Sequence, residues 1–347
     1  MCRLHLPVVL LLAVLLSGCD NTATAFQDRF FALGTLVEIS IYGADPAKAA
    51  RASEQIEQEL LAMHTSWHAW QPGALSSTNE QLATMKSFTP DPTVLPLLQE
   101  AARLSQLSNG LFNPAIGKLV ALWGFHDNAL PVGTLPDATA ITTLVKQAPG
   151  TNDITISDSQ LVSHNPAVRF DLGAFAKGYA IDRAIERLHE FDIQNAIINA
   201  GGDLRAIGKH GDRPWRIGIR HPRQNGILAS IEIDGDTSVF TSGDYERFFE
   251  VDGKRYHHII DPRSGYPADK TISVTVIHDN ATTADAASTA LFVAGPDEWV
   301  DIARNMDIEL VMLIDNDGVF HMSPAMQTRI HLEPDMAAEI RVSEPLS

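Results

Sequence analysis

Hydrophobic and polar positions alternate in some segments of the chain and recur at helical spacing in others. The alternation at 35–42 predicts a strand with one buried face. Alanine and leucine then recur at helical spacing over 46–63, and a proline opens this segment, as is common in the first turn of a helix. Helical spacing also predicts helices at 92–107, 137–147, 174–190, 284–293 and 298–305.

Short apolar runs separated by Gly, Pro, Asn and Asp dominate the second half of the chain. They predict strands at 196–199, 215–220, 227–233, 247–251, 255–260, 271–277, 309–314 and 318–322. Strands and helices are intermixed without a regular β–α–β alternation. We therefore predict an α+β fold with mainly antiparallel sheets and packed helices.

The first eighteen residues have the pattern of a secretory leader. A basic start precedes nine apolar residues at 8–16, too few for a membrane-spanning helix of about 20 residues. The sequence Leu-Ser-Gly-Cys that ends at Cys19 is a bacterial lipobox, which predicts lipidation of Cys19, and the following Asp20 resembles an inner-membrane retention signal. We expect a signal peptide at 1–18, a tether at 19–25 and a domain at 26–345, on the periplasmic face of the inner membrane. An uncleaved leader without lipid is the alternative.

The charge and the cysteine count exclude several function classes. The 26 Lys and Arg residues against 43 Asp and Glu residues give a net charge of −17, which argues against a nucleic-acid surface. An anionic ligand would need local positive charge, such as a divalent cation. Cys2 lies in the leader and Cys19 would carry lipid, so we expect neither a disulfide nor a thiol nucleophile. The motifs GxGxxG, HExxH and GxSxG do not occur.

The segment HHIIDPRSGYP at 257–267 concentrates chemical groups on a short turn. Two prolines restrict the backbone and Gly265 can adopt positive φ, so the imidazoles, Asp261 and Arg263 would stand on a stiff loop. A hairpin connector with a surface ion pair is the alternative interpretation.

Asp285 and Thr289 are four residues apart on a predicted helix. Their carboxylate and hydroxyl would project from one face, and Mg²⁺ prefers such hard oxygen donors. In the alternative, Asp285 caps the helix N-terminus and Thr289 is merely buried.

Three further segments combine small residues with polar groups. DLGAFAKGYAID at 171–182 would let a ligand or a neighbouring element approach the backbone, and Lys177 could meet a phosphate. INAGGDLRAIG at 198–208 places Gly201 and Gly202 at a strand end, as an anion-binding nest or as a plain hairpin turn. TSGDYERF at 241–248 offers hydroxyls and a carboxylate at a strand end.

Aromatic residues supply candidate walls for a flat ring. The run FNPAIGKLVALWGF opens with Phe112 and Asn113, and core packing is its default explanation. Trp70 could stack on an aromatic ligand. His64 and His68, at helical spacing, are a weaker candidate for a transition-metal site.

In this order, LGT at 33–35, the run from Phe112, DLGAFAKGYAID, INAGGD, TSGDYERF, HHIIDPRSGYP and the helix with Asp285 and Thr289 resemble the FAD:protein FMN transferases, the ApbE-type lipoproteins. The order holds along nearly the whole mature chain. The resemblance implies two intertwined subdomains related to the tunnelling fold, bound FAD and one or two Mg²⁺ ions. It also implies transfer of FMN from FAD to a threonine hydroxyl, with release of AMP. The implied acceptors are flavoprotein subunits of respiratory ion pumps of the Nqr and Rnf types.

The resemblance also implies roles for individual residues. Asp285, Thr289 and the carbonyl of Ala174 would hold Mg²⁺, and His258 would take the proton of the acceptor threonine, with Asp261 orienting it. Imidazole suits that task because its ordinary pKa lies near the working pH. The implied FAD contacts are Leu33, Trp70, Phe112, Asn113, Lys177, Gly201, Gly202, Asp203, Thr241, Ser242, Gly243, Asp244, His258, Arg263 and Gly265.

The chain departs from the family pattern at two positions of these motifs. Leu33 stands in place of a usual methionine and Ser264 in place of a frequent threonine. Two other functions fit the same residues. One is a Mg²⁺-dependent FAD pyrophosphatase, and the other is a flavin-binding periplasmic lipoprotein without transfer activity.

Overall fold

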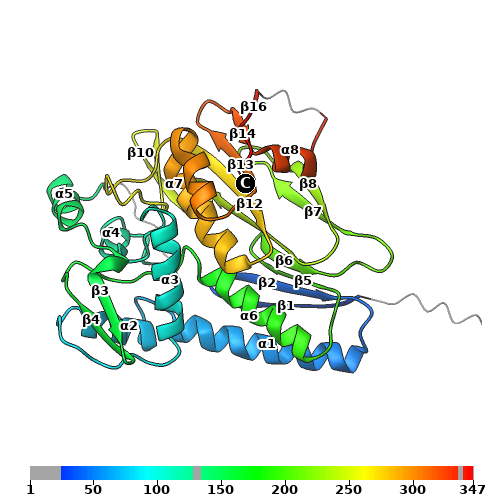
Figure 1. Ribbon diagram of the computed structural model, residues 1–347, viewed down its shortest axis with the longest axis horizontal. Helices are drawn as coiled ribbons and strands as arrows, with labels where there is room; N and C mark the ends of the chain where they lie inside the picture. Colours follow the sequence, from blue (N-terminus) through cyan, green and yellow to red (C-terminus); the bar gives the residue numbers. More distant parts are fainter. Residues whose placement is uncertain (1–24, 128–133, 335–338, 347) are drawn as a thin grey trace, which may run out of the picture.

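The computed structural model describes residues 25–127, 134–334 and 339–346 (Figure 1). The predicted signal peptide and the lipidation site Cys19 lie outside the described residues, as does all of the tether except its last residue. No helix within the described ranges is both long and apolar enough to cross a membrane.

A nine-stranded sheet forms the centre of the fold. Neighbouring strands run antiparallel, except for the last pair, which is parallel. The prediction of an α+β fold with a mainly antiparallel sheet is confirmed. In spatial order the strands are β1 (Phe26–Ala32), β2 (Thr35–Ile41), β5 (Ala196–Ala200), β6 (Asp203–Ile207), β9 (Thr237–Gly243), β12 (Thr271–His278), β13 (Leu310–Asp315), β14 (Phe320–Met322) and β16 (Ile340–Val342).

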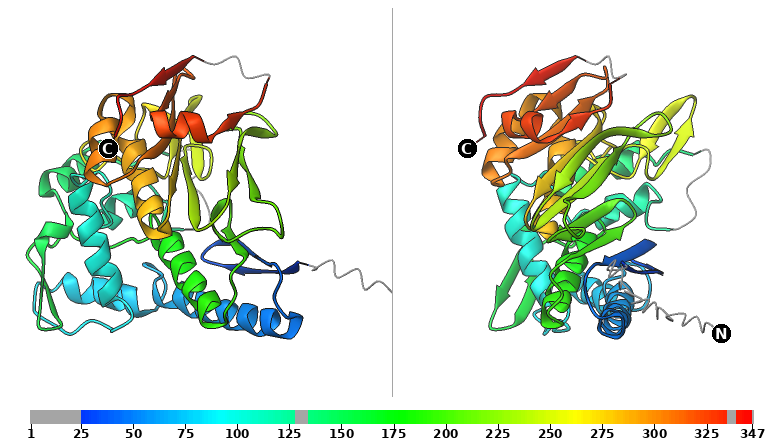
Figure 2. Two further views of the ribbon diagram at one scale, coloured as in Figure 1. Left: turned by 45° about the vertical axis from the view of Figure 1, so that its right-hand side comes forward. Right: turned by 90° about the vertical axis from the view of Figure 1, so that its right-hand side faces the viewer.

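Three long helices pack against one face of this sheet and bury the larger core. They are α1 (Pro46–Ser66), α6 (Ala176–Glu190) and α7 (Ala281–Asn305). The side chain of Asp45 accepts a hydrogen bond from the Lys48 amide and begins α1, and Asn280 begins α7 in the same way through the Thr283 amide. Figures 1 and 2 show α6 and α7 crossing this face of the sheet.

Shorter elements surround this centre. The helices are α2 (Ala74–Leu82), α3 (Leu95–Leu107), α4 (Gly117–Leu122), α5 (Ala138–Gln147), a 3₁₀ turn (Thr151–Asp153) and α8 (Pro324–Arg329). A three-stranded sheet of β7 (Trp215–Arg220), β8 (Ile227–Ile233) and β15 (His331–Leu332) covers a second apolar cluster on the central sheet. Two separate hairpins are β3 (Ile154–Ser157) with β4 (Gln160–Ser163), and β10 (Phe248–Val251) with β11 (Lys254–His257).

A third apolar cluster anchors the loop after β11. It includes Trp123, Phe125, Ile141 and Phe249, so α4, α5 and the β10–β11 hairpin meet there. The indole Nε1 of Trp123 donates a 2.7 Å hydrogen bond to the carbonyl of Gly265. The loop is therefore fixed from behind by a small core of its own.

The two helices predicted at 284–293 and 298–305 form one kinked element, α7. Its backbone leaves helical geometry at Gly295, where φ is +69°, and Pro296 follows. A proline inside a helix cannot donate the usual backbone hydrogen bond, which accounts for the break.

Candidate active site

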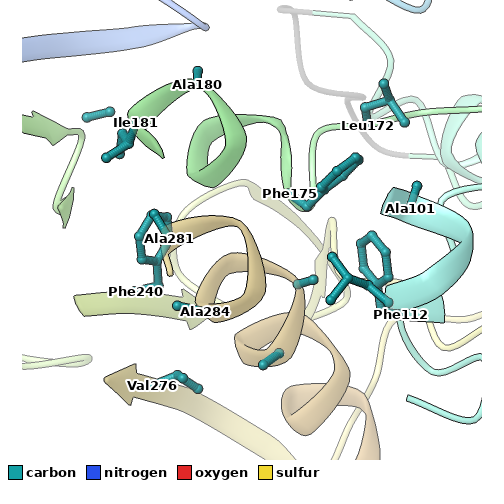
Figure 3. Packing of buried hydrophobic residues seen from close by; sticks show 14 of the residues in the cluster. Ala101, Phe112, Leu172, Phe175, Ala180, Ile181, Phe240, Val276, Ala281 and Ala284 are labelled. Carbon is teal, nitrogen blue, oxygen red and sulfur yellow. The ribbon is translucent and has the colours of Figure 1, made fainter. Parts of the chain in front are cut away.

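Helices α6 and α7 cross at a contact that only glycine allows. A Cβ atom on Gly178 would lie 2.3 Å from the carbonyl oxygen of Ala281 and 2.8 Å from Cβ of Asp285. Figure 3 shows Ile181 on α6 and Ala281 and Ala284 on α7 among the buried residues of this region. The crossing brings the Gly178 amide to Asp285, which accepts its hydrogen bond at Oδ2 over 2.9 Å.

Asp285 is a buried carboxylate with few partners. It is 5% exposed, and burial raises its pKa to about 8 although Lys177 opposes the shift. The field at this position therefore favours a proton or an added cation over a bare carboxylate.

Hydroxyl groups meet one turn further along α7. Thr289 is partly exposed, and its Oγ1 lies 3.4 Å from Ser242 Oγ at the end of β9. Ser242 Oγ lies 2.8 Å from Ser288 Oγ, which donates to the backbone carbonyl of Asp285 at 2.9 Å. The structure thus brings the predicted Asp285 and Thr289 together with Ser242 from TSGDYERF.

The carbonyl of Ala174 lies just before α6. In a regular helix this oxygen would accept from the Gly178 amide, but that amide donates to Asp285 instead. Within the described ranges no backbone amide donates to the Ala174 carbonyl. A free carbonyl at this turn is chemically suited to a cation.

The oxygen donors of this turn fit Mg²⁺ better than a softer metal. No group of three or more His, Cys, Asp or Glu side chains gathers for a metal in the described part of the chain. Mg²⁺ is usually held by one or two carboxylates, with the remaining positions filled by water and substrate phosphates. One buried carboxylate, one hydroxyl and one carbonyl satisfy that preference.

A partly buried ion pair stands beside this turn. The ammonium of Lys177 pairs with Asp203 Oδ2, and Asp203 Oδ1 accepts from the Thr241 amide at 2.9 Å. Burial alone lowers the pKa of Lys177, but Asp203 and Asp285 raise it above its usual value. Lys177 therefore carries a fixed positive charge next to Asp285.

Gly201 and Gly202 form a tight turn between β5 and β6, with φ of +69° and +105°. The Gly201 amide donates to the carbonyl of Leu36 and the Gly202 amide to Asn199 Oδ1 at 2.8 Å. Both amides have protein partners, which favours the hairpin-turn alternative over the anion-binding nest, and the FAD contacts of Gly201 and Gly202 stay predictions. Leu33, with φ of +54°, occupies the β1–β2 turn, and its contact with FAD stays a prediction.

The two histidines of HHIIDPRSGYP have different surroundings. His257 is 5% exposed, donates through Nε2 to the Ala268 carbonyl at 2.7 Å and accepts from the Ile259 amide at Nδ1. His258 is partly exposed, and its Nδ1 donates to the Arg247 carbonyl at 3.3 Å. That bond leaves Nε2 of His258 unprotonated and without a hydrogen-bond partner among the described residues.

The pKa of His258 differs from the expectation. Burial, together with neighbouring His257 and Arg247, lowers it to about 3, whereas the sequence suggested an ordinary imidazole near the working pH. The imidazole is therefore neutral at physiological pH and able to accept a proton, though as a weaker base.

Asp261 does not contact His258 through a hydrogen bond in the described structure. Its carboxylate accepts from the backbone amide, Nε and Nη2 of Arg263. The group that orients His258 is the carbonyl of Arg247, so the role given to Asp261 is corrected. Arg263 also binds Glu298, and its guanidinium is directed at protein groups.

Asp244 is held by Arg223, a residue that was not predicted from the sequence to belong to the site. Arg223, between β7 and β8, makes a bidentate pair with Asp244 at 2.7 and 2.6 Å. The ring of Tyr245 would lie 2.5 Å from a Cβ on Gly243, which explains the glycine. Their contacts with FAD stay predictions.

Phe112 does not line a site. It is 0% exposed and packs edge-on against Phe175, so the core explanation holds (Figure 3). Asn113 is likewise structural, since its amide donates to the Pro149 carbonyl and its Oδ1 accepts from the Ala115 amide.

Trp70 is partly exposed and lies beside Asp171, the first residue of the DLGAFAKGYAID segment. Its Nε1 donates to Asp171 at 2.9 Å and the guanidinium of Arg169 lies 4.2 Å from its ring centre. His68 lies beyond the end of α1, and its Nδ1 accepts from the amides of Trp70 and Gln71. This capping role replaces the idea of a transition-metal pair with His64.

Comparison with known proteins identifies the family of the chain. A sequence profile described as the ApbE family matches residues 33–312. An FAD:protein FMN transferase of Klebsiella pneumoniae is 30% identical over 332 residues, covering 91% of this chain and 94% of that protein. The chain belongs to the ApbE family.

Other relatives extend the same result. An FAD:protein FMN transferase of Rhodobacter capsulatus is 41% identical over 304 residues, which are 88% of this chain but only 58% of that protein. The crystal structure of an ApbE protein from Thermotoga maritima has a TM-score of 0.80 and 34% identity, covering 88% of this chain and 99% of that one. The flavin transferase ApbE of Vibrio cholerae has a TM-score of 0.77 and 28% identity, with the same coverage.

One buried carboxylate beside this candidate site, Asp182, was not predicted from the sequence as a functional residue. Asp182 closes the motif DLGAFAKGYAID, and its carboxylate accepts from the amides of Ala281 and Thr282 and from the Thr282 hydroxyl. It thereby fixes the start of α7 one turn before Asp285. The sequence signal was a carboxylate on the apolar side of a predicted helix, which needs a partner when buried.

Proposed function

We propose that the protein is a Mg²⁺-dependent FAD:protein FMN transferase. It moves FMN from FAD to a threonine hydroxyl of a target flavoprotein subunit and releases AMP. Membership of the ApbE family gives the enzyme class. The observation that supports the metal-dependent chemistry is the contact of Asp285 with the Gly178 amide on α6, and of Thr289 with Ser242 on β9, beside the Lys177–Asp203 pair.

Asp285, Thr289 and the Ala174 carbonyl would hold the ion. Mg²⁺ bound there would neutralise charge on the FAD diphosphate and on the departing AMP. Lys177 supplies a second, permanent positive charge on the same side. Together, the Mg²⁺ ion and Lys177 would allow a chain of net charge −17 to bind an anionic dinucleotide.

His258 would act as the base. The threonine oxygen attacks the FMN-side phosphorus while the bond from that phosphorus to the AMP oxygen breaks, and AMP leaves with the electron pair. The hydroxyl proton passes to Nε2 of His258, which is free because Nδ1–H is held by the Arg247 carbonyl. His257 is unsuited to this task, because both of its nitrogens have partners.

The proposed location rests on the predicted lipobox, and the proposed acceptors rest on the family resemblance. A lipid on Cys19 would tether the enzyme to the periplasmic face of the inner membrane, and subunits of Nqr- or Rnf-type ion pumps are the proposed acceptors. A relation to the tunnelling fold, with two intertwined subdomains, belongs to the same proposal.

The test is an incubation of the purified protein with FAD, Mg²⁺ and a threonine-bearing acceptor subunit, followed by intact mass measurement of the acceptor. We expect the acceptor to gain the mass of one FMN less one water, and Asp285→Ala to abolish this gain. Asp297→Asn, an exposed carboxylate on the same helix, is the matched control. Free FMN and AMP with an unmodified acceptor would identify a pyrophosphatase instead. Recovery of intact FAD would identify a flavin-binding protein.

A further inference from the structure

Arg263 joins the loop 258–267 to helix α7. Its Nε donates to Asp261 at 3.0 and 3.1 Å, and its Nη2 donates to Asp261 at 2.9 Å, within the loop. Its Nη1 donates to both carboxylate oxygens of Glu298 at 2.8 and 3.0 Å, and its Nη2 also reaches the Val293 carbonyl at 3.2 Å. Glu298 and Val293 belong to α7, so one side chain bridges the two elements.

The contact falls where the first part of α7 ends. Val293 lies one turn after Thr289, and the helix breaks two residues later at Gly295. Carbonyls at the C-terminal end of a helix lack intrahelical partners and carry the negative end of the helix dipole. A guanidinium at Val293 satisfies such a carbonyl and complements that charge.

A second contact holds the beginning of the same loop. The buried ring of His257 packs edge-on against Phe292 of α7, with 5.4 Å between ring centres. Its nitrogens are bound to Ala268 and Ile259, so the ring cannot rotate freely. His258 follows His257 directly, so it lies between two contacts with α7, one made by His257 and the other by Arg263.

We propose that Arg263 is a positioning residue that sets the distance between His258 and the Asp285–Thr289 turn. The inference rests on the proposed function, because it assigns the two elements to one reaction. Its guanidinium acts through the protein and leaves FAD binding to other residues. Proton transfer to His258 requires the base at a fixed place relative to the phosphorus held at α7, and small displacements of such a group are costly.

The experiment compares Arg263→Ala with Lys270→Ala. Lys270 pairs with Asp297 at 2.7 Å near the same kink but outside the loop, so it is a matched control. For Arg263→Ala we expect kcat to fall about 10- to 100-fold, with KM for FAD changed by less than about twofold. Millimolar guanidinium ion should restore part of kcat in Arg263→Ala but none in His258→Ala. Lys270→Ala should retain wild-type kcat.

A double-mutant cycle locates the effect. Glu298→Gln should lower kcat in the wild-type background and add little in Arg263→Ala, because both changes cut the same bridge. Wild-type kcat in Arg263→Ala, a raised KM with unchanged kcat, or fully additive losses would each overturn the positioning role.

Hydrogen exchange separates this inference from the proposed function. We expect faster amide exchange at 258–267 in Arg263→Ala than in the wild type, with no change in Lys270→Ala. Unchanged exchange in Arg263→Ala would contradict the bridge. If the wild type transfers no FMN while exchange responds as expected, the proposed function fails and the bridge stands.

Discussion

The two halves of the site are held in place by different means. The proposed metal half, at the α6–α7 crossing, depends on backbone contact: Gly178 has no room for a Cβ, and its amide binds Asp285 directly. The histidine half, at 258–267, depends on side chains that reach from elsewhere, such as Trp123 and Arg263. The first half tolerates almost no change in volume, whereas the second can be loosened in steps. Substitutions at the α6–α7 crossing should therefore abolish activity, whereas substitutions around the loop 258–267 should reduce it by degrees.

The largest effect is expected for Gly178→Ala. The added methyl group must displace the Ala281 carbonyl or Asp285, which separates the two helices and breaks the amide bond to the carboxylate. We expect about 1–3 kcal/mol of lost stability and loss of FMN transfer, measured by thermal unfolding and acceptor mass. Gly150→Ala is the control, because nothing lies within 4 Å of its Cβ position. Near-wild-type transfer in Gly178→Ala would contradict the crossing as the basis of the site.

The next largest effect is expected for loss of the Asp285 carboxylate, the proposed Mg²⁺ ligand. Asp285→Asn keeps the shape and the hydrogen-bond acceptor for Gly178 but removes the charge. We expect Mg²⁺ binding, followed by calorimetry, to weaken by about 100-fold or more, in line with the weight of a direct carboxylate ligand. Titration of Asp297→Asn should match the wild type. Equal Mg²⁺ affinity in Asp285→Asn would remove this residue from the metal site.

A graded effect is expected for His258→Ala. The proposed Mg²⁺ ligands and most of the predicted FAD contacts lie on other elements, so we expect FAD affinity to stay within about twofold while the single-turnover transfer rate falls by about 10²- to 10⁴-fold. His331→Ala, an exposed imidazole on β15 outside the proposed site, is the control. A transfer rate that survives in His258→Ala would show that another group accepts the proton.

The smallest effect, and the one that best separates the halves, is the response to pH. Burial raises the pKa of Asp285 to about 8, so below that pH Mg²⁺ must displace a proton, and its affinity should fall about tenfold per pH unit. The same group makes the metal-free fold less stable as pH rises from the ordinary carboxylate range toward 8, because the folded state keeps a proton that the unfolded state has released.

The lowered pKa of His258 has the opposite consequence for the pH dependence of transfer. Its pKa is lowered to about 3, so it stays deprotonated down to about pH 5, and at saturating Mg²⁺ the transfer rate should be flat from about pH 8 to 5. At limiting Mg²⁺ the rate should decline below about pH 8. A decline centred near pH 6.5 at saturating Mg²⁺ would instead indicate an ordinary imidazole.

Periodicity and spacing predicted the parts of the fold that are local. The alternation at 35–42 became β2, the helical spacing at 46–63 became α1, and the four-residue interval placed Asp285 and Thr289 on one helix. Strands β1, β3, β4, β6, β9, β15 and β16 went unpredicted. Within the central sheet, charged residues interrupt the apolar pattern of β6, and β9 mixes Thr, Ser and Gly with only two large apolar residues.

Contacts between distant segments were beyond the sequence. The Gly178 amide meets Asp285 across 107 positions, and the tautomer of His258 is set by the Arg247 carbonyl. Backbone partners of this kind leave no side-chain pattern to read. Arg263 shows the same limit, since the family resemblance implied a contact with FAD while its partner Glu298 lies 35 residues away.

The central claim is that Asp285 and Thr289 hold a hard cation against the diphosphate of FAD. A crystal of the protein soaked with FAD and Mn²⁺, as an anomalous scatterer in place of Mg²⁺, tests it most directly. We expect a peak about 2.1–2.2 Å from oxygens of both residues and from a phosphate oxygen. A peak at other protein atoms, or a diphosphate bound away from α7, would contradict the account.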